Sequence, residues 1–258
     1  MAAPSQGPNR YPNGFTSDPV YGPLGQMGMQ NPFFYHLWSD DFDQEIAESG
    51  YTKTTTGNGT VALAAGDGGL ALFTTNTSTP ATTDIASIQL PVAGFTFTAG
   101  KKSFFLTRVQ SSDMTNAAIL AGLIQTTTTP FTVTDGIYFY KASGAASLVL
   151  ITTVGSVPTS LTIPTSAYSL ANNVNVDLGF YVDRKQNIYA FVGAQLVGYL
   201  PQQGTGSTVP SGAVAAIQQT ITPTTLTTAN LNPTLAIQSG TASSKTMAAD
   251  FLLAAKER

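Results

Sequence analysis

The clearest hydrophobic pattern in the chain lies in residues 174–200, where apolar and polar positions alternate with the period of a β-strand. Leu178, Phe180 and Val182 fall on one side of the first expected strand, and acidic, glycine and tyrosine residues fall on the other. The β-branched and aromatic content of the segment favours a strand over a helix. We therefore expect a sheet with one apolar face that another layer of the fold must cover.

Two turns divide this segment into three strands. The run Asp-Arg-Lys-Gln-Asn at 183–187 has the polar residues of an exposed turn, and a second strand is expected over 188–192. Gly193-Ala194 then reverses the chain, and a third strand runs over 195–200 until Pro201 ends it. These residues predict an antiparallel meander.

Short strands separated by turn residues are expected along the rest of the chain. Residues 60–64 and 70–73 read as a hairpin around Gly-Asp-Gly-Gly at 66–69. Residues 117–124 suit a short helix and a strand about equally. Further strands are expected at 85–90, 102–109, 137–141 and 148–152, with Arg108 as the charge expected near the sheet. The regular spacing predicts an all-β fold, an antiparallel β-sandwich or jelly roll.

The last expected strand lies in residues 247–258. This segment has helical propensity, but we expect a strand through Phe251 and Leu253, because a sandwich needs a partner for the strand expected at Phe42.

Two segments differ from this strand pattern. Residues 1–35 combine frequent proline and glycine, which oppose helix and continuous sheet, with aromatic residues that a disordered tail would lack. We interpret them as an extended N-terminal arm that docks on protein, with a floppy tail as the simpler alternative. Residues 36–258 are expected to form a single β-sandwich domain with a Thr-rich excursion at about 202–245. One or two strands are expected within this excursion, which has apolar islands at 214–217 and 235–237, and whether it contacts partners is left open.

The composition narrows the function classes. Of the 258 residues, 42% are hydrophobic and only 10% are charged, so a core is expected and much of the surface is expected to face other proteins. The net charge of −3 offers no basic face for nucleic acid. The chain has no cysteine and one histidine, His36, so neither a thiolate nor a multi-histidine metal site is expected. No apolar run approaches the roughly 20 residues that span a bilayer.

Two sets of acidic residues invite a chemical interpretation. Asp41, Asp43 and Glu45 would share one face of a strand, as the paired carboxylates of a glycoside hydrolase do. A solvated strand edge or a salt-bridging patch is the preferred interpretation, because these residues stand at the start of the domain and the chain has one Trp. Asp135, Asp177 and Asp183 are acids of loops or strand ends that could bind calcium, but no Asp-x-Asn cluster surrounds them. No catalytic residue, metal or cofactor is therefore predicted.

The order of these features resembles the concanavalin-A-like jelly roll of laminin-G-like and legume-lectin-like domains. The resemblance is carried by Trp-Ser-Asp-Asp-Phe at 38–42, the 66–69 hairpin, Asp-Gly-Ile-Tyr-Phe at 135–139 and the strand run at 180–193. The combination also resembles virion structural proteins of tailed bacteriophages, which use such a sandwich as a head-decorating or cement protein. The resemblance covers roughly residues 38–200 and 246–254.

The resemblance implies a non-enzymatic virion protein that decorates a phage capsid. It would be made in the host cytoplasm and would bridge neighbouring major capsid subunits on the capsid surface, with copies of itself as further partners. Aromatic anchors dominate interface energetics, so the predicted partner-binding residues are Tyr11, Phe15, Tyr21, Phe33, Phe34 and Tyr35. The alternatives are a carbohydrate-binding module of a phage fibre or receptor-binding protein, with a glycan as its partner, and a glycoside hydrolase.

Overall fold

The computed structural model describes residues 33–43, 50–66, 68–193, 195–202 and 225–258, and within these ranges nearly every regular element is a strand. One short 3-10 turn, η2 (Thr165–Ala167), accompanies them. The predicted all-β class is confirmed. The strands are β1 (Tyr35–Asp40), β2 (Thr52–Thr55), β3 (Thr60–Ala64), β4 (Leu70–Thr74), β5 (Ile85–Gln89), β6 (Ser103–Ser111), β7 (Ala117–Ile124), β8 (Gly136–Lys141), β9 (Leu148–Val154), β10 (Val157–Thr162), β11 (Val176–Val182), β12 (Ile188–Val192), β13 (Gln195–Leu200), β14 (Asn232–Ser239) and β15 (Thr246–Glu257).

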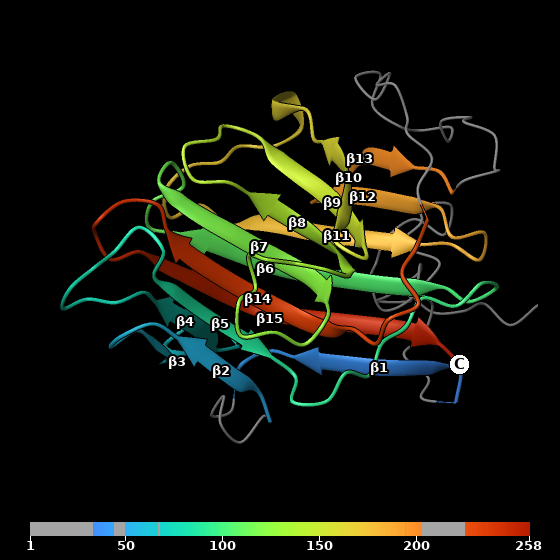
Figure 1. Ribbon diagram of the computed structural model, residues 1–258, viewed down its shortest axis with the longest axis horizontal. Helices are drawn as coiled ribbons and strands as arrows, with labels where there is room; N and C mark the ends of the chain where they lie inside the picture. The colour runs from blue at the N-terminus through green and yellow to red at the C-terminus, as the bar shows by residue number, and fades with distance from the viewer. Residues whose placement is uncertain (1–32, 44–49, 67, 194, 203–224) are drawn as a thin grey trace, which may run out of the picture.

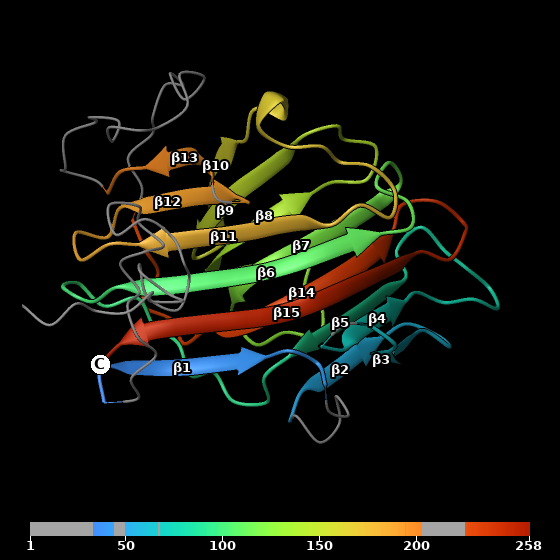
Figure 2. The same cartoon turned by 180° about the vertical axis from the view of Figure 1, so that it is seen from behind.

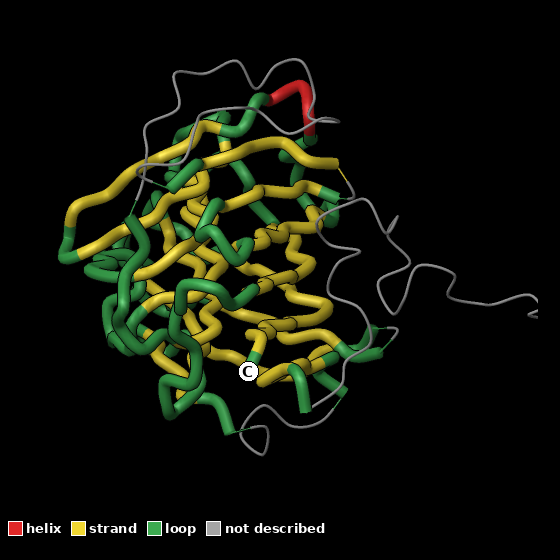
Figure 3. The backbone as a smooth tube through the Cα atoms, turned by 90° about the vertical axis from the view of Figure 1, so that its right-hand side faces the viewer, coloured by secondary structure: helices red, strands yellow, loops and turns green. Residues whose placement is uncertain are grey.

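The strands form two antiparallel sheets that face each other (Figures 1 and 3). Sheet A has the order β13-β12-β11-β6-β15-β4-β3, with β1 pairing with the second half of β15. Sheet B has the order β10-β9-β8-β7-β14-β5-β2. Neighbours such as β6 and β15 are far apart in sequence, so the sandwich is closed by non-local pairing.

The core lies between the sheets and follows the alternation seen in the sequence. Leu178, Phe180 and Val182 point inward from β11 and are at most 3% exposed. The ring of Phe180 stacks on Phe105 of β6 at 5.3 Å between centroids, and Phe139 of sheet B approaches it at 6.4 Å. These contacts fix the two layers against each other.

Strand β7 decides the choice that the sequence left open at residues 117–124. All eight of its residues are buried, and it pairs with β8 on one side and β14 on the other. Its outward residue Leu120 belongs to a small cluster against which Phe131 and Val133 of the next loop pack. A strand covered on both faces needs no polar alternation, which is why the pattern alone could not separate helix from strand.

The last strand confirms the predicted pairing of the chain's two distant parts. β15 runs antiparallel to β6 along most of its length and to β1 over residues 252–257, with a bulge at Asp250. Partners on both sides explain why these residues form a strand despite their helical propensity. The pairing places Tyr35, the last residue of the expected arm, in β1.

One expectation from the sequence needs correction. β1 ends at Asp40, and Phe42 turns the chain with φ of 54° while its ring enters the core, so Asp41 and Asp43 do not lie on a strand. The backbone N–H of Phe42 donates to the Asp40 carboxylate at 2.8 Å, which stabilises this turn.

The excursion expected at 202–245, for which one or two strands are predicted, holds one strand within its described residues. Residues 232–239 form β14, which lies between β7 and β5 in sheet B. Its threonine and asparagine are buried but hydrogen-bonded, as where Gln89 Nε2 donates to Thr234 Oγ1 at 2.8 Å. The apolar residues 235–237, which indicate a strand in the sequence, therefore belong to a central strand of sheet B. Among the residues described, no helix has the length and apolar character needed to cross a membrane.

Candidate functional site

The outer face of sheet A carries a row of aromatic side chains across four strands. The register places Phe104 of β6, Tyr181 of β11, Tyr189 of β12 and Tyr199 of β13 opposite one another in turn. Figure 2 shows these strands side by side. Successive ring centroids are 4.9, 5.5 and 5.1 Å apart. We call these four residues the aromatic row.

The aromatic row is closed to water. Phe104, Tyr181 and Tyr199 are at most 4% exposed, and burial, followed by the Asp183 carboxylate, raises the pKa of Tyr181 and of Tyr189 above the usual range. Phe104, Tyr181 and Tyr189 stack on one another, so the neighbouring rings occupy the ring faces that a ligand would need. The aromatic row is therefore unsuited to stacking on a small ligand.

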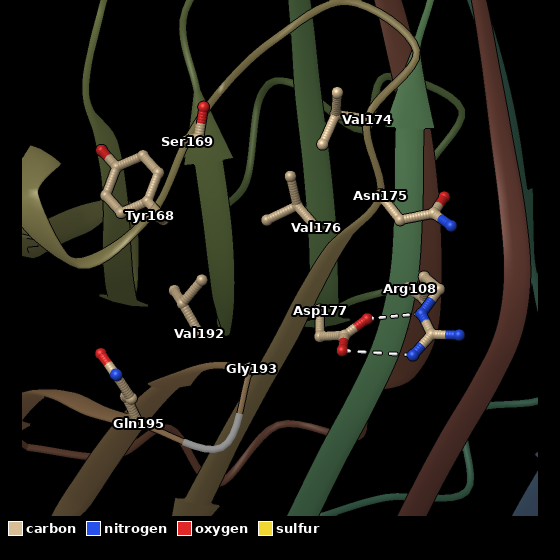
Figure 4. A pocket seen from close by; sticks show the side chains of 10 residues that line it. All are labelled: Arg108, Tyr168, Ser169, Val174, Asn175, Val176, Asp177, Val192, Gly193 and Gln195. Atoms are coloured by element: carbon tan, nitrogen blue, oxygen red, sulfur yellow. Dashed lines mark hydrogen bonds and ion pairs between the residues drawn. The ribbon is translucent and has the colours of Figure 1, made fainter.

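A pocket opens at the end of sheet A where β11 begins, four residues along β11 from Tyr181 of the aromatic row. Its volume is about 640 Å³, and Figure 4 shows Arg108 and Asn175 on one side and Tyr168 and Gln195 on the other. The lining comes from β6, from the segment between η2 and β11, and from the turn between β12 and β13. It comprises Arg108, Tyr168, Ser169, Val174, Asn175, Val176, Asp177, Val192, Gly193 and Gln195.

An ion pair forms the charged wall of the pocket. Arg108 Nε donates to Asp177 Oδ1 at 2.6 Å and Nη2 donates to Oδ2 at 3.3 Å, while Nη1 donates to Asp250 Oδ2 at 3.1 Å. The hydrogen bond to Asp177 is the main cause that raises the pKa of Arg108. The side chains of Arg108 and Asp177 are 38% and 41% exposed, so a ligand can reach both.

The opposite walls supply polar groups and a fixed backbone. The side chains of Ser169, Asn175 and Gln195 are exposed, and in the described part of the chain the two amides make no hydrogen bond. The segment that carries Asn175 is tied down because Asn172 Oδ1 accepts from Met114 N at 2.8 Å and Asn173 N donates to Ser111 O at 2.8 Å. Gly193 N donates to Asp177 O at 2.9 Å, which holds the β12–β13 turn beside β11. The pocket thus offers free amides on an anchored frame.

The predicted arm residues are only partly within the described chain. Tyr11, Phe15 and Tyr21 lie outside the described residues. Phe33 and Phe34 are 86% and 65% exposed. Tyr35 is half-buried in β1, and its ring lies 6.3 Å from that of Phe104, at the edge of the aromatic row. The structure therefore brings one predicted anchor to the outer face of sheet A.

The acidic residues considered for catalysis and calcium are used in other ways. Asp41 and Asp43 are exposed, and Glu45 lies outside the described residues. Asp135 accepts from Gly155 N and from Thr227 Oγ1, and Asp183 accepts two backbone N–H groups of its own turn. Within the described ranges no three His, Cys, Asp or Glu side chains gather as a metal site would require.

Sequence reasoning recognised Arg108 as a charge near the sheet but missed the pocket. Asn175 and Gln195 are ordinary polar residues at the ends of strands, 20 positions apart, and the antiparallel β11–β12–β13 meander brings their segments together. The pairing register of β6 with β11 places Arg108 opposite Asp177, and knowledge of this register would have located the pocket. No local motif encodes that register.

Comparisons with known proteins show the fold. No protein-family model matches the chain, and the search of curated proteins returned no match. Among solved structures, the endo-1,3-beta-glucanase of Streptomyces sioyaensis is similar with a TM-score of 0.56 and 12% identity, covering 88% of this chain and 98% of that one. A protein of unknown function from Shewanella oneidensis MR-1 follows with 0.53 and 11%, covering 87% of each chain. The carbohydrate recognition domain of Emp47p has 0.52 and 10%, covering 88% and 98%. At such identities the likeness supports the jelly-roll fold alone.

Proposed function

We propose that this chain is a non-enzymatic carbohydrate-binding module, which binds a neutral saccharide in the pocket beside Arg108. The observation that carries the proposal is the pair of free, exposed amides, Asn175 and Gln195, that flank the Arg108–Asp177 ion pair around one open pocket. Amides donate and accept hydrogen bonds at once, which suits sugar hydroxyls. Tyr168 and Val174 add apolar surface for the carbon skeleton of a sugar ring.

The descriptions of two structural neighbours support the choice of ligand. One is a carbohydrate recognition domain and the other is a glucanase, and both share the sandwich at TM-scores above 0.5. Because similarity of fold alone does not establish function, the proposal of a sugar ligand must rest on the site. The size and the polar lining of the pocket are consistent with a sugar ligand.

The charges of the pocket favour a neutral sugar. One guanidinium faces two carboxylates, those of Asp177 and Asp250, so the site carries no surplus positive charge for an acidic sugar. The same ion pair argues against hydrolysis. Asp177 is engaged through both oxygens with Arg108, and the second carboxylate, Asp250, pairs with the same guanidinium and does not line the pocket. A retaining or inverting glycosidase needs one carboxyl group of its site as a proton donor.

The double variant Asn175→Ala/Gln195→Ala tests this pocket. We expect its affinity for the best-binding member of a panel of neutral oligosaccharides, β-1,3-linked gluco-oligosaccharides included, to fall by at least about tenfold, because two hydrogen bonds of roughly 1 kcal/mol each are lost. Isothermal titration calorimetry measures the change. Asn230→Ala, an exposed amide that does not line the pocket, is the control and should bind as the wild type does. Equal affinity of the double variant, or no binding of any neutral oligosaccharide, would refute the proposal.

A second candidate is the capsid-decorating function that the sequence resemblance implies. The observation that favours it is the adjacent pair Phe33 and Phe34, which present large apolar rings to solvent at the start of β1. Such rings are typical anchors in protein interfaces. This proposal places the chain on the surface of a phage head, in contact with the major capsid protein.

Substitution of these two rings tests that candidate. We expect Phe33→Ser/Phe34→Ser to reduce cosedimentation with empty capsids at least about tenfold, since each buried aromatic anchor contributes more than 1 kcal/mol. Val92→Ser, which removes another exposed apolar side chain, is the matched control. Undiminished cosedimentation of the double variant would rule out these anchors, and no cosedimentation of the wild type would remove the candidate.

A further inference from the structure

The outer face of sheet A holds a second apolar cluster that neither proposed function uses. It surrounds the aromatic row and extends from β13 to β1. Its buried members are Phe104, Tyr181, Phe191 and Ala255, and Tyr35, Leu37, Leu106, Tyr189, Leu196 and Leu253 pack against them. We call these ten residues the outer cluster. Its members are buried or half-buried although they lie on the outer face of the sandwich, as is expected of a surface that packs against polypeptide.

We propose that the outer cluster is the docking surface for the chain's own N-terminal segment, residues 1–32. The place where this segment joins the fold supports the docking. It leads through Phe33 and Phe34 into Tyr35, and Tyr35 is itself a member of the outer cluster. The segment therefore reaches the domain at the border of this surface and needs no crossing to the other sheet.

The segment is long enough to cross the whole outer cluster. From β1 to β13 the outer cluster spans five strand-to-strand steps, or about 24 Å at about 4.8 Å per step. A fully extended chain of 32 residues would span roughly 100 Å at about 3.3 Å per residue, several times that distance. Attachment at the border also gives the segment a high effective concentration at the cluster, which favours its own domain over that of another molecule.

The composition of the segment is also complementary to the apolar surface of the outer cluster. Residues 1–32 carry only two charges, Arg10 and Asp18, together with Tyr11, Phe15 and Tyr21. The proline and glycine between them disfavour a helix and leave an extended chain. Such a chain can lay aromatic rings at intervals along a surface of aromatic and leucine side chains without burying a charge. The phenylalanine and tyrosine edges of the outer cluster provide the corresponding contacts.

Photo-crosslinking in the full-length protein tests this docking. The variant Phe15→p-benzoylphenylalanine is irradiated at low concentration, and the crosslinked peptides are identified by mass spectrometry. We expect crosslinks within one molecule, from position 15 to peptides that contain Phe104, Tyr181 or Tyr189. The same probe at Val92, an exposed position outside the outer cluster, should give none of them.

A charge placed in the outer cluster supplies the second readout. Leu253 packs against the buried members of the outer cluster and is only partly buried, so Leu253→Lys should preserve the fold. It should lower the yield of these crosslinks about tenfold, because a lysine ammonium disfavours apolar contact. Val92→Lys should leave the yield unchanged. Circular dichroism confirms that both variants remain folded.

Two results would overturn the inference. The first is crosslinks from position 15 that fall elsewhere or do not form. The second is crosslinks to the same peptides that appear only in covalent dimers, which would show that the segment of a second copy occupies the surface. If the segment does cover its own sheet, Phe33 and Phe34, and not the three aromatic residues before them, are the anchors left for a capsid neighbour.

Discussion

Phe180→Ala is expected to lower the free energy of unfolding by about 4 kcal/mol, the largest loss among the changes considered for this chain. The ring of Phe180 is fully buried between the sheets, stacked on Phe105 and close to Phe139. Its removal leaves a cavity where β11 and β6 meet sheet B, and rigid neighbouring strands cannot close it. Urea unfolding followed by far-ultraviolet circular dichroism measures the loss.

A matched control separates this effect from a general sensitivity to shortening an apolar side chain. Val92→Ala shortens a side chain that is 76% exposed and should change stability by less than about 0.5 kcal/mol. If Phe180→Ala cost no more than that control, Phe180 would not lie at the centre of the sandwich, and the inward face assigned to β11 would be wrong.

Asp113→Asn is the second change with a large expected effect, about 3 kcal/mol of stability lost at neutral pH. Asp113 Oδ2 pairs with Lys245 Nζ at 2.6 Å, and the side chain of Lys245 is only 7% exposed. Asp113 also accepts from the backbone N–H groups of Thr115 and Asn116, which fixes the turn before β7. The amide leaves a buried ammonium without its counter-charge.

The pH dependence of this effect has a definite sign. The hydrogen bond from Lys245 is the main cause that holds the pKa of Asp113 well below its usual range. A depressed carboxyl pKa contributes stability that is fully present above the unfolded value, about 3.9, and is lost as the pH falls toward the folded value.

The difference between wild type and Asp113→Asn should therefore narrow as the pH falls below about 4. Unfolding curves at a series of pH values measure it. Asp43→Asn, at an exposed carboxylate, is the control and should track the wild type throughout. A gap that stays constant down to the lowest pH would contradict the role assigned to the Asp113–Lys245 pair.

Local sequence signals predicted the elements whose cause is local. The meander of β11, β12 and β13 follows from alternation and from its two turns, where Asp183 caps one and Gly193 adopts φ of 60° in the other. The 66–69 hairpin follows from glycine in the same way. In each case the residues that define the turn lie beside the strands they join.

Elements stabilised by distant partners were harder to predict. An apolar island at 235–237 indicates a strand in the Thr-rich excursion, but the position of β14 between β7 and β5 comes from pairing with distant segments. β1 ends at Asp40, and Phe42 turns the chain with its ring in the core. Asp41 and Asp43, which were expected to share one face of a strand, therefore do not lie on a strand. Tertiary contacts overrode local pattern at these positions.

The candidate site was the least predictable part for the same reason. Arg108, Asn175 and Gln195 come from three segments, and each is an unremarkable residue in its own surroundings. Only the register of β6 with β11, and of β11 with β12 and β13, brings them around one pocket. The aromatic row likewise exists through cross-strand pairing, although each of its residues was visible as part of an expected strand.

The most direct test of the binding function is an NMR titration of the isotope-labelled full-length protein with its best-binding neutral oligosaccharide. The pocket account predicts saturable shifts of backbone amides concentrated in residues 168–177 and 192–196, with Arg108 among them and the sheet B strands unchanged. Shifts confined to another surface, or none at millimolar oligosaccharide, would contradict it.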